Sequence, residues 1–419
     1  MMVQLLVLAD DFTGALDTGV KFADIGIHTQ VVVAQALDFR AVATSVTVLV
    51  VDLQTRHQSP EAAYQIVYQI AKQALAFGIP SILKKTDSAL RGNIGSELTA
   101  LYEASKQAIL PFIPALPAMN RTTVNGIHLI DGVPVNESVF ANDPFSPVKQ
   151  AFVVDVIKEQ SDVDVHLVPI GEAAVVDKCG ILVLDAKTDA DLVETVKNLH
   201  QQKALTVMAG CSGIGGALPE VLGLTGGQLR SFQQLARFVV ICGSINPITT
   251  AQIMQAKVAG FAHIELTLKE KMDATFWTTP AGSYRVKEIV AILNHHPRAM
   301  ISSFDWPDQE ATLAYGKKHG ISANQVGDFI ASSMGALLKA IIETGFVATF
   351  LVTGGDTIQG FMRQINRHEL DIITEIAPGS VLSQFTYNDV CQQLISKSGG
   401  FGDENLLVAI ADKLNIKSG

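Results

Sequence analysis

Several features that mark common classes of protein are scarce or absent in this sequence. Only 4 of the 419 residues are cysteines, and they form no CxxC pair, so neither a disulfide framework nor a zinc site is expected. We expect all four to be reduced thiols in the core. Charged residues make up 17% of the chain, and 31 Lys+Arg stand against 41 Asp+Glu without any Lys/Arg-rich run. A general nucleic-acid binder needs a basic surface, so that class is excluded.

Export and membrane signals are absent as well. The N-terminal apolar run stops at Asp10 and has no basic segment before it, which predicts a first strand rather than a signal peptide. No apolar stretch approaches the ~20 residues of a membrane-spanning helix. We therefore expect a cytoplasmic protein that binds no membrane, and a homo-oligomer is compatible with the sequence.

Motifs of several large enzyme classes are also missing. The chain contains no GxxxxGK[ST] phosphate loop and no GxGxxG dinucleotide motif, which disfavours an NAD-dependent dehydrogenase. It has no GxSxG turn, which disfavours an α/β-hydrolase. A phosphatase of the haloacid dehalogenase type would need an aspartate at position 9, where this chain has Ala9, so we exclude that class too.

Apolar residues in alternating strand and helix patterns are abundant. Hydrophobic residues make up 48% of the chain, and short β-branched runs alternate with helical patterns. This alternation predicts an α/β fold whose largely parallel sheets are flanked by helices. Helices are expected at 59–77, 94–104, 324–342 and 358–365. Strands are expected at 3–9, 30–33, 46–53, 81–84, 108–112, 163–168, 181–184, 205–209, 238–242, 263–268, 299–303 and 349–352.

The length of the chain suits two domains. We place their boundary in the polar, glycine-containing stretch near residue 228, which gives domains of residues 1–228 and 229–419. The stretch from Pro111 to Pro147 is rich in Pro, Asn and Gly and predicts a long irregular loop, although its Asp131-Gly132 pair is typical of a hairpin. Irregular loops of that length are commonly functional.

The first domain carries acidic and basic side chains where predicted strands end. Asp10 and Asp11 follow the first strand, and Asp11 could bind a substrate hydroxyl, accept a proton or cap the next helix. Lys85 and Arg91 flank Asp87 and Ser88 after another strand, a pattern suited to a carboxylate or phosphate but also to a solvated salt bridge. Two further basic candidates are Arg56 and Arg121.

The second domain carries glycine-rich turns at predicted strand ends. Turns of this kind, facing helix N-termini, offer backbone N–H groups to phosphates without obstruction by side chains. Four of them in one domain favour a nucleotide site. They are the segments at 241–246, 352–357, 378–380 and 397–403.

Taken together, six segments resemble the four-carbon acid sugar kinase family. They are ADDFTGALD, KKTDSALRGN, PALPxxxRTT, CGSxxPxT, TGGDT and KSGGFGDEN, in the order found in the family and over nearly the whole chain. The resemblance implies ATP-dependent phosphorylation of a tetronate at its terminal hydroxyl. It also implies an N-terminal substrate domain and a C-terminal nucleotide domain.

By motif position, the resemblance also implies the residues that contact each ligand. The implied contacts to ATP are Ser244, Gly354, Gly355, Asp356, Thr357 and Gly400. The implied contacts to the sugar acid are Asp11, Arg56, Lys85, Thr86, Asp87 and Ser88. Mg²⁺ is expected with ATP, but the sequence assigns it no protein ligands.

Our leading hypothesis is a kinase whose active site lies in the cleft between two domains. Asp11 would orient the attacking hydroxyl and accept its proton, with Asp87 as the second choice. Arg91, together with Arg56 and Lys85, would bind the carboxylate or the transferring phosphoryl group. D-threonate is the favoured substrate. The alternatives are D-erythronate, 3-oxo-tetronate and a non-catalytic protein that only binds a sugar acid.

Overall fold

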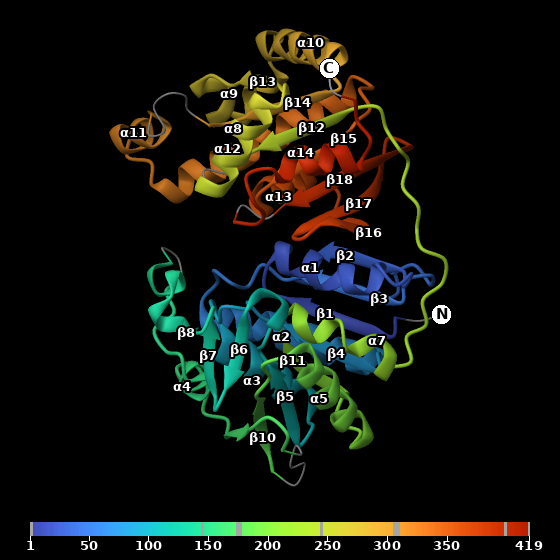
Figure 1. The fold of residues 1–419 in the computed structure, drawn as a ribbon, viewed down its shortest axis with the longest axis vertical. Coiled ribbons are helices and arrows are strands. Elements are labelled where there is room, and N and C mark those ends of the chain that lie inside the picture. The colour runs from blue at the N-terminus through green and yellow to red at the C-terminus, as the bar shows by residue number, and fades with distance from the viewer. Residues whose placement is uncertain are drawn as a thin grey trace. The chain divides into compact units, whose positions relative to one another are not determined.

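The computed structural model describes residues 3–143, 146–172, 178–243, 246–304, 311–397 and 400–417. The chain divides into two compact units, Met1–Arg230 and Ser231–Gly419 (Figure 1). The predicted division follows residue 228. Each unit contains hydrogen-bonded strands flanked by helices and a hydrophobic core cluster. The predicted fold class is therefore confirmed for each unit, while the cleft between domains stays a prediction.

The first unit contains a parallel sheet with the strand order β2-β3-β1-β4-β11-β5-β10-β9. The predicted strands of this half are confirmed to within a few residues. They are β1 (Leu5–Ala9), β2 (Thr29–Val33), β3 (Val48–Asp52), β4 (Ser81–Lys85), β5 (Ile109–Ile113), β9 (Val165–Val168), β10 (Gly180–Leu184) and β11 (Val207–Gly210).

Helices flank this sheet, and local signals set where they begin. α1 (Phe12–Ala23) follows β1 directly. α2 (Pro60–Phe77) begins with Ser59 as N-cap and proline at its first position, and it ends at Gly78 with φ +90°. Buried residues of α2, α3 (Ile94–Ser105) and α4 (Val153–Lys158) form one core cluster with alternate residues of the central strands. α5 (Asp189–Gln201), α6 (Ser212–Gly215) and α7 (Leu218–Val221) complete the helices described in this unit.

β1 lies between β3 and β4, and the chain changes direction across the sheet at this point. After β1 it passes to β2 and β3 on one side and then crosses to β4 on the other. The connections above the carboxyl ends of these strands therefore diverge. Open α/β sheets bind their ligands at such a switch point.

The stretch between Pro111 and Pro147, predicted to be irregular, contains a small antiparallel sheet. β6 (Arg121–Val124), β7 (Ile127–Ile130) and β8 (Val133–Pro134) pair in that order. Asn125-Gly126 and Asp131-Gly132 have positive φ and form the two hairpin turns. The hairpin at Asp131-Gly132 is confirmed, whereas the prediction of a long loop without regular structure was wrong. Three short 3₁₀ turns, η1 (Pro117–Met119), η2 (Val135–Glu137) and η3 (Val139–Asn142), lie in the same stretch.

The second unit contains a mixed sheet with the order β13-β14-β12-β15-β18-β17-β16. β12 (Phe238–Cys242), β13 (Ala262–Glu265), β14 (Arg298–Ser302) and β15 (Thr349–Thr353) are parallel and were predicted. Three strands of this sheet were not predicted, namely β16 (Glu369–Ala377), β17 (Ser380–Tyr387) and β18 (Val390–Lys397). β18 is parallel to β15, but β17 and β16 continue the sheet in antiparallel fashion.

The helices of the second unit begin with α8 (Pro247–Val258), α9 (Leu268–Met272) and α10 (Pro280–His295), with η4 (Ala274–Thr278) between the last two. α11 (Ala311–Lys318), α12 (Ala323–Glu343), α13 (Gly355–Gln364) and α14 (Leu406–Lys413) follow. Gln325–Glu343 is long and apolar enough to cross a membrane by length and composition, but 61% of its apolar window is buried inside the protein. α12 also packs against α13 and η4, so it serves as a core helix.

None of the four cysteines, all of which lie in the described part of the chain, forms a disulfide, but the expectation that all lie in the core was wrong. Cys211 and Cys242 are buried, whereas Cys179 and Cys391 are exposed.

Candidate active site

The first unit gathers charged side chains at the carboxyl edge of its central strands. β3, β1 and β4 are neighbours, with Ala9 aligned with Asp52 and Lys85. The residues that follow these strands therefore meet at one edge of the sheet, at the switch point. The structure brings the implied sugar-acid contacts together there, namely Asp11, Arg56, Lys85, Thr86, Asp87 and Ser88.

Arg56 links the three turns through ion pairs with three carboxylates. Its Nε donates to Asp10 Oδ2 at 2.8 Å and its Nη1 donates to Asp11 Oδ2 at 2.8 Å. Its Nη2 lies 3.4 Å from Asp87 Oδ1. Burial opposes the charged form of Arg56, but these three carboxylates raise its pKa well above the usual value. Arg56 is thus a fixed cation whose charge the protein already balances.

Asp11 is both a helix cap and a reachable carboxylate. Its Oδ1 accepts the N–H of Gly14 at 2.9 Å, so the capping interpretation is confirmed. The Asp11 side chain is nevertheless 26% exposed, against 2% for Asp10. A Cβ on Gly14 would lie 2.5 Å from Asp11 Oδ1 and 2.7 Å from Lys85 Nζ. Glycine at position 14 therefore leaves room for a carboxylate and an ammonium over the start of α1.

Asp87 is held as an anion by the arginines around it. Arg91 Nε donates to Asp87 Oδ2 at 2.9 Å and Nη2 donates to Oδ1 at 3.0 Å, a two-pronged pair. Arg91 Nη1 also donates to Asp143 Oδ2 at 2.9 Å. Burial alone would raise the pKa of Asp87, but Arg56 and Arg91 hold it well below the usual value. A carboxylate held in this way is a poor proton acceptor, so the geometry does not favour Asp87 as the alternative base.

The small sheet of the first unit holds the turn after β4. Arg121 Nη1 on β6 donates to Ser88 Oγ, and His128 Nε2 on β7 hydrogen bonds to the Ser88 carbonyl at 2.9 Å. His128 Nδ1 also hydrogen bonds to Thr123 Oγ1 at 3.0 Å. Burial lowers the pKa of His128 to about 4, so the ring is neutral at pH 7. Thr86 is buried and its N–H donates to the Gly210 carbonyl at 2.8 Å, which ties the same turn to β11.

Sequence reasoning missed two buried acidic residues beside this site. Asp52 at the end of β3 is fully buried, and burial together with Asp11 and Asp10 raises its pKa to about 8. Glu97 on α3 lies 3.1 Å from Lys84 Nζ and accepts a hydrogen bond from Thr55. The signal for Asp52 was its place directly after the apolar run VLVV, the same position that singled out Asp10.

In the second unit, the carboxyl ends of the parallel strands also meet at one edge. Cys242 aligns with Thr353, and Thr353 aligns with Lys397. Gly354, with φ +89°, is the N-cap of α13, and its N–H donates to the Lys397 carbonyl at 3.0 Å. A Cβ on Gly243 would lie 2.3 Å from Thr357 Oγ1, so the turn after β12 lies directly against the start of α13.

The implied nucleotide contacts differ in where they lie relative to this edge of the sheet. Gly354, Gly355, Asp356 and Thr357 form the turn into α13, with Asp356 exposed and Thr357 buried. Gly400 lies after β18, and a Cβ on it would approach Asn246 Nδ2 to 3.9 Å. Ser244 lies outside the described residues. The predicted helix at 358–365 begins earlier, at Gly355.

One of the four predicted phosphate turns was misread. Pro378-Gly379-Ser380 joins the antiparallel strands β16 and β17, so this turn leads into a strand and not into a helix. Its glycine has φ +69°, and a Cβ there would lie 2.4 Å from the Phe401 ring. This glycine is therefore required by the turn and its packing.

Lys397 at the end of β18 is a buried cation at the same edge. It is 1% exposed, and its Nζ donates to Thr249 Oγ1 of α8 at 3.2 Å. Burial lowers its pKa to about 8. The edge thus combines glycine turns with a buried amine that is still largely protonated at pH 7.

Comparison with known families assigns a role to each unit. A family model described as a sugar-binding N-terminal domain matches residues 5–218, and one described as a nucleotide-binding C-terminal domain matches residues 239–407. Curated relatives align along almost the whole chain. D-threonate kinase of Salmonella typhimurium is 27% identical over 97% of both chains. The chain belongs to the four-carbon acid sugar kinase family.

Other members of the four-carbon acid sugar kinase family differ in the substrate that their names state. D-erythronate kinase of Heliobacterium modesticaldum is 25% identical over 99% of this chain and 98% of its own. 3-oxo-tetronate kinase of Burkholderia multivorans is 24% identical over 94% of both chains. Solved structures share the fold. The structure of a Salmonella typhimurium LT2 protein aligns with 97% of this chain and 98% of its own chain, at 20% identity and a TM-score of 0.80. The structure of a Haemophilus influenzae protein aligns with 97% of this chain and 99% of its own chain, at 21% identity and a TM-score of 0.76.

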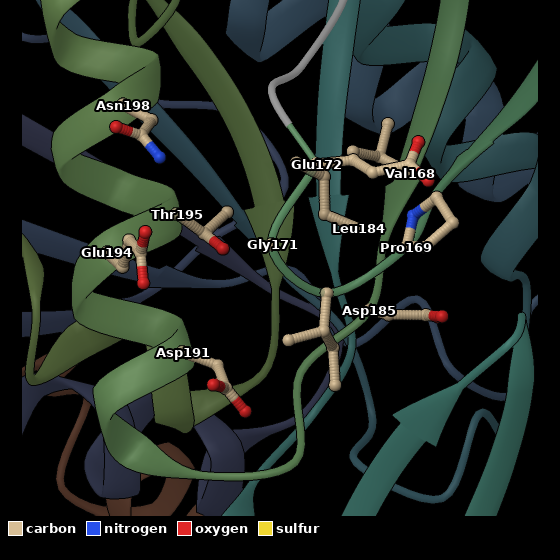
Figure 2. A pocket seen from close by; sticks show the side chains of 11 residues that line it. Val168, Pro169, Gly171, Glu172, Leu184, Asp185, Asp191, Glu194, Thr195 and Asn198 are labelled. Carbon is tan, nitrogen blue, oxygen red and sulfur yellow. The ribbon is translucent and has the colours of Figure 1, made fainter.

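A pocket elsewhere in the sugar-binding domain does not suit an acidic substrate of this family. It lies between α5 and the ends of β9 and β10 (Figure 2). Among the described residues, its lining includes Glu172, Asp185, Asp191 and Glu194 but no lysine or arginine. A sugar acid would be repelled there, whereas the edge around Arg56 and Lys85 carries several cations.

Proposed function

We propose that the protein transfers the γ-phosphoryl group of ATP to the terminal hydroxyl of a four-carbon sugar acid, with D-threonate as the leading substrate. The observation that carries the proposal is that Asp11 and Lys85 both lie beside the position that a Cβ on Gly14 would take, at the switch point of the sugar-binding domain. The assignment to D-threonate is supported by the 27% identical relative of that name. A cytoplasmic location fits a reaction that consumes ATP.

Asp11 is the group proposed to orient the attacking hydroxyl and to accept its proton. It is the more exposed of the two adjacent carboxylates, and Gly14 and Arg56 fix its position. Lys85 Nζ donates to the Thr86 carbonyl at 2.6 Å and lies beside Asp11, where it can stabilise charge on the transferring phosphoryl group. Phosphoryl transfer depends mainly on such positioning and charge stabilisation.

Arg91 and Asp87 are proposed to act as a pair that shapes the site. Their two-pronged contact and the contact of Arg91 with Asp143 hold the turn after β4 in place. Arg56 acts in the same way between the three turns. The substrate would then meet Lys85 and Ser88 on a preformed surface, while the buried Thr86 holds the turn through its N–H.

The nucleotide is proposed to bind at the carboxyl edge of the second sheet. The first N–H groups of α13, beginning at Gly355, suit the phosphates of ATP because helix N-termini attract anions. Ser244 and Gly400 remain proposed contacts. The described residues contain no group of three or more His, Cys, Asp or Glu that could hold a metal ion, so we assign Mg²⁺ no protein ligand.

The test of this function is ADP release measured with D-threonate, D-erythronate, L-threonate and 3-oxo-tetronate, followed by identification of the product. We expect one four-carbon acid to support turnover. Asp11→Asn should lower kcat on the order of 100-fold, because it removes the proton acceptor. The Asn side chain can still cap α1, so the melting temperature should change little. Asp38→Asn, an exposed aspartate of the same unit, is the matched control and should keep full activity. Undiminished turnover in Asp11→Asn would remove Asp11 from the mechanism.

A non-catalytic sugar-acid binding protein is the second candidate. Calorimetry separates the two, because a binding protein needs no nucleotide whereas a kinase must bind ATP. Binding of a four-carbon acid without any binding of ATP or release of ADP would favour the second candidate.

A further inference from the structure

The cations at the carboxyl edge of the first sheet fall into two groups. Arg56 contacts three carboxylates within 3.4 Å, and Arg91 contacts two. Their charges are therefore balanced by the protein itself. Among the described residues, Arg121 and Lys85 have no carboxylate within ion-pair distance, although both lie at the same edge.

Arg121 has most of its hydrogen-bonding capacity unused. The described residues accept one of its N–H groups, at Ser88 Oγ, while a guanidinium carries five. Its guanidinium carbon lies 5.2 Å from the centre of the Phe140 ring, and that of Arg91 lies 5.1 Å from the same ring. Phe140 thus supports Arg121 without neutralising it.

The charge of Arg121 is under-compensated as a result. Burial lowers its pKa although the charge of Asp87 opposes this, whereas three carboxylates raise the pKa of Arg56. A partly buried cation with no carboxylate within ion-pair distance is costly unless a ligand supplies the negative charge. A planar carboxylate matches the fork of the guanidinium and can bind it through two parallel hydrogen bonds.

We infer that Arg121 binds the carboxylate of the sugar acid and thereby sets the direction in which the substrate lies. This inference rests on the proposed function and deepens it. Asp11 follows β1 and Lys85 is the last residue of β4, whereas Arg121 reaches the turn after β4 from the small sheet that follows β5. The acid end of the substrate would lie at Ser88 and Arg121, and its terminal hydroxyl would lie at Asp11 and Lys85. Ser88 is a positioning residue in this arrangement, because its hydroxyl holds the guanidinium.

The inference is tested by calorimetry of D-threonate and of its carboxamide without nucleotide, in the wild type, Arg121→Gln, Arg121→Lys and Ser88→Ala. The wild type should bind the acid at least about tenfold more tightly than the neutral amide, as charge-assisted hydrogen bonds predict. Arg121→Gln should lose that preference while its affinity for the amide changes little. Arg121→Lys should restore part of it, and Ser88→Ala should weaken it less than Arg121→Gln does. Melting temperatures establish that each variant is folded, and Arg121→Lys carries the test if Arg121→Gln does not fold.

Two results would overturn the inference. One is an unchanged preference for the acid in folded Arg121→Gln or Arg121→Lys. The other is an equal fall in kcat on acid and amide with unchanged nucleotide-free binding, which would assign Arg121 to the transferring phosphoryl group. The calorimetry needs no turnover, so a wild type that binds the acid through Arg121 but releases no ADP contradicts the proposed function alone.

Discussion

Four aspartates lie at the carboxyl edge of the first sheet, and their surroundings give them different properties. Asp87 is kept ionised by Arg56 and Arg91, and Asp10 by Arg56 and the neighbouring lysines, with its pKa lowered although burial opposes this. Asp52 is buried near Asp11 and Asp10 and has a pKa of about 8. Asp11 alone is both reachable and positioned by two donors. The groups packed around each of these four aspartates thus determine its charge and its accessibility.

The raised pKa of Asp52 predicts how stability depends on pH. Between its usual pKa of 3.8 and the folded value of about 8, the folded state keeps a proton that the unfolded state has lost. The contribution of Asp52 to the free energy of unfolding therefore falls as pH rises, by at most about 1.4 kcal/mol per pH unit. The side chain in Asp52→Asn cannot titrate, so this slope should be lost. The melting temperature of the variant should therefore rise relative to that of the wild type between about pH 5 and about pH 8. Parallel pH profiles for the two proteins would contradict the assignment.

Several of the parallel strands were predictable because both of their faces are buried. β1, β3, β12 and β15 are continuous apolar runs, which stand out from the polar turns around them. β16 and β17 lack that pattern. β16 carries Glu369, Asp371 and Glu375, and register shifts in its pairing with β17 break the alternation that marks a half-buried strand. The contact of Arg121 with Ser88 could not be predicted from the sequence, because only tertiary folding brings the two residues together.

The two neighbouring glycines at the start of α13 have different roles. Gly354 needs its hydrogen side chain for a φ of +89°, whereas Gly355 lies within the helix. Gly355→Val should raise KM for ATP by roughly tenfold, because a branched side chain would obstruct the phosphates, equivalent to ~1.4 kcal/mol of lost binding. Affinity for the sugar acid should stay unchanged. Gly354→Ala should instead lower the melting temperature, since a Cβ in the left-handed region costs roughly 1 kcal/mol. Normal ATP affinity in folded Gly355→Val would place the phosphates elsewhere.

Each unit has its own hydrophobic core and its own matching family model. A ligand that binds one unit should therefore protect that unit first. In hydrogen exchange, a four-carbon acid alone should slow amides near 10–14, 54–58 and 85–91, and a non-hydrolysable ATP analogue alone should slow those near 354–360. Uniform protection of both units by either ligand alone would show that the units respond as one.

The small sheet of β6, β7 and β8 has a consequence for how such an enzyme can change. It is an insertion between β5 and α4, and it supplies both Arg121 and His128 to the turn after β4. In the proposed arrangement, the groups that select the acid lie on this insertion, while Asp11 belongs to the main sheet. Recombination or drift confined to roughly one hairpin could therefore alter which acid is accepted and leave the phosphoryl-transfer chemistry intact.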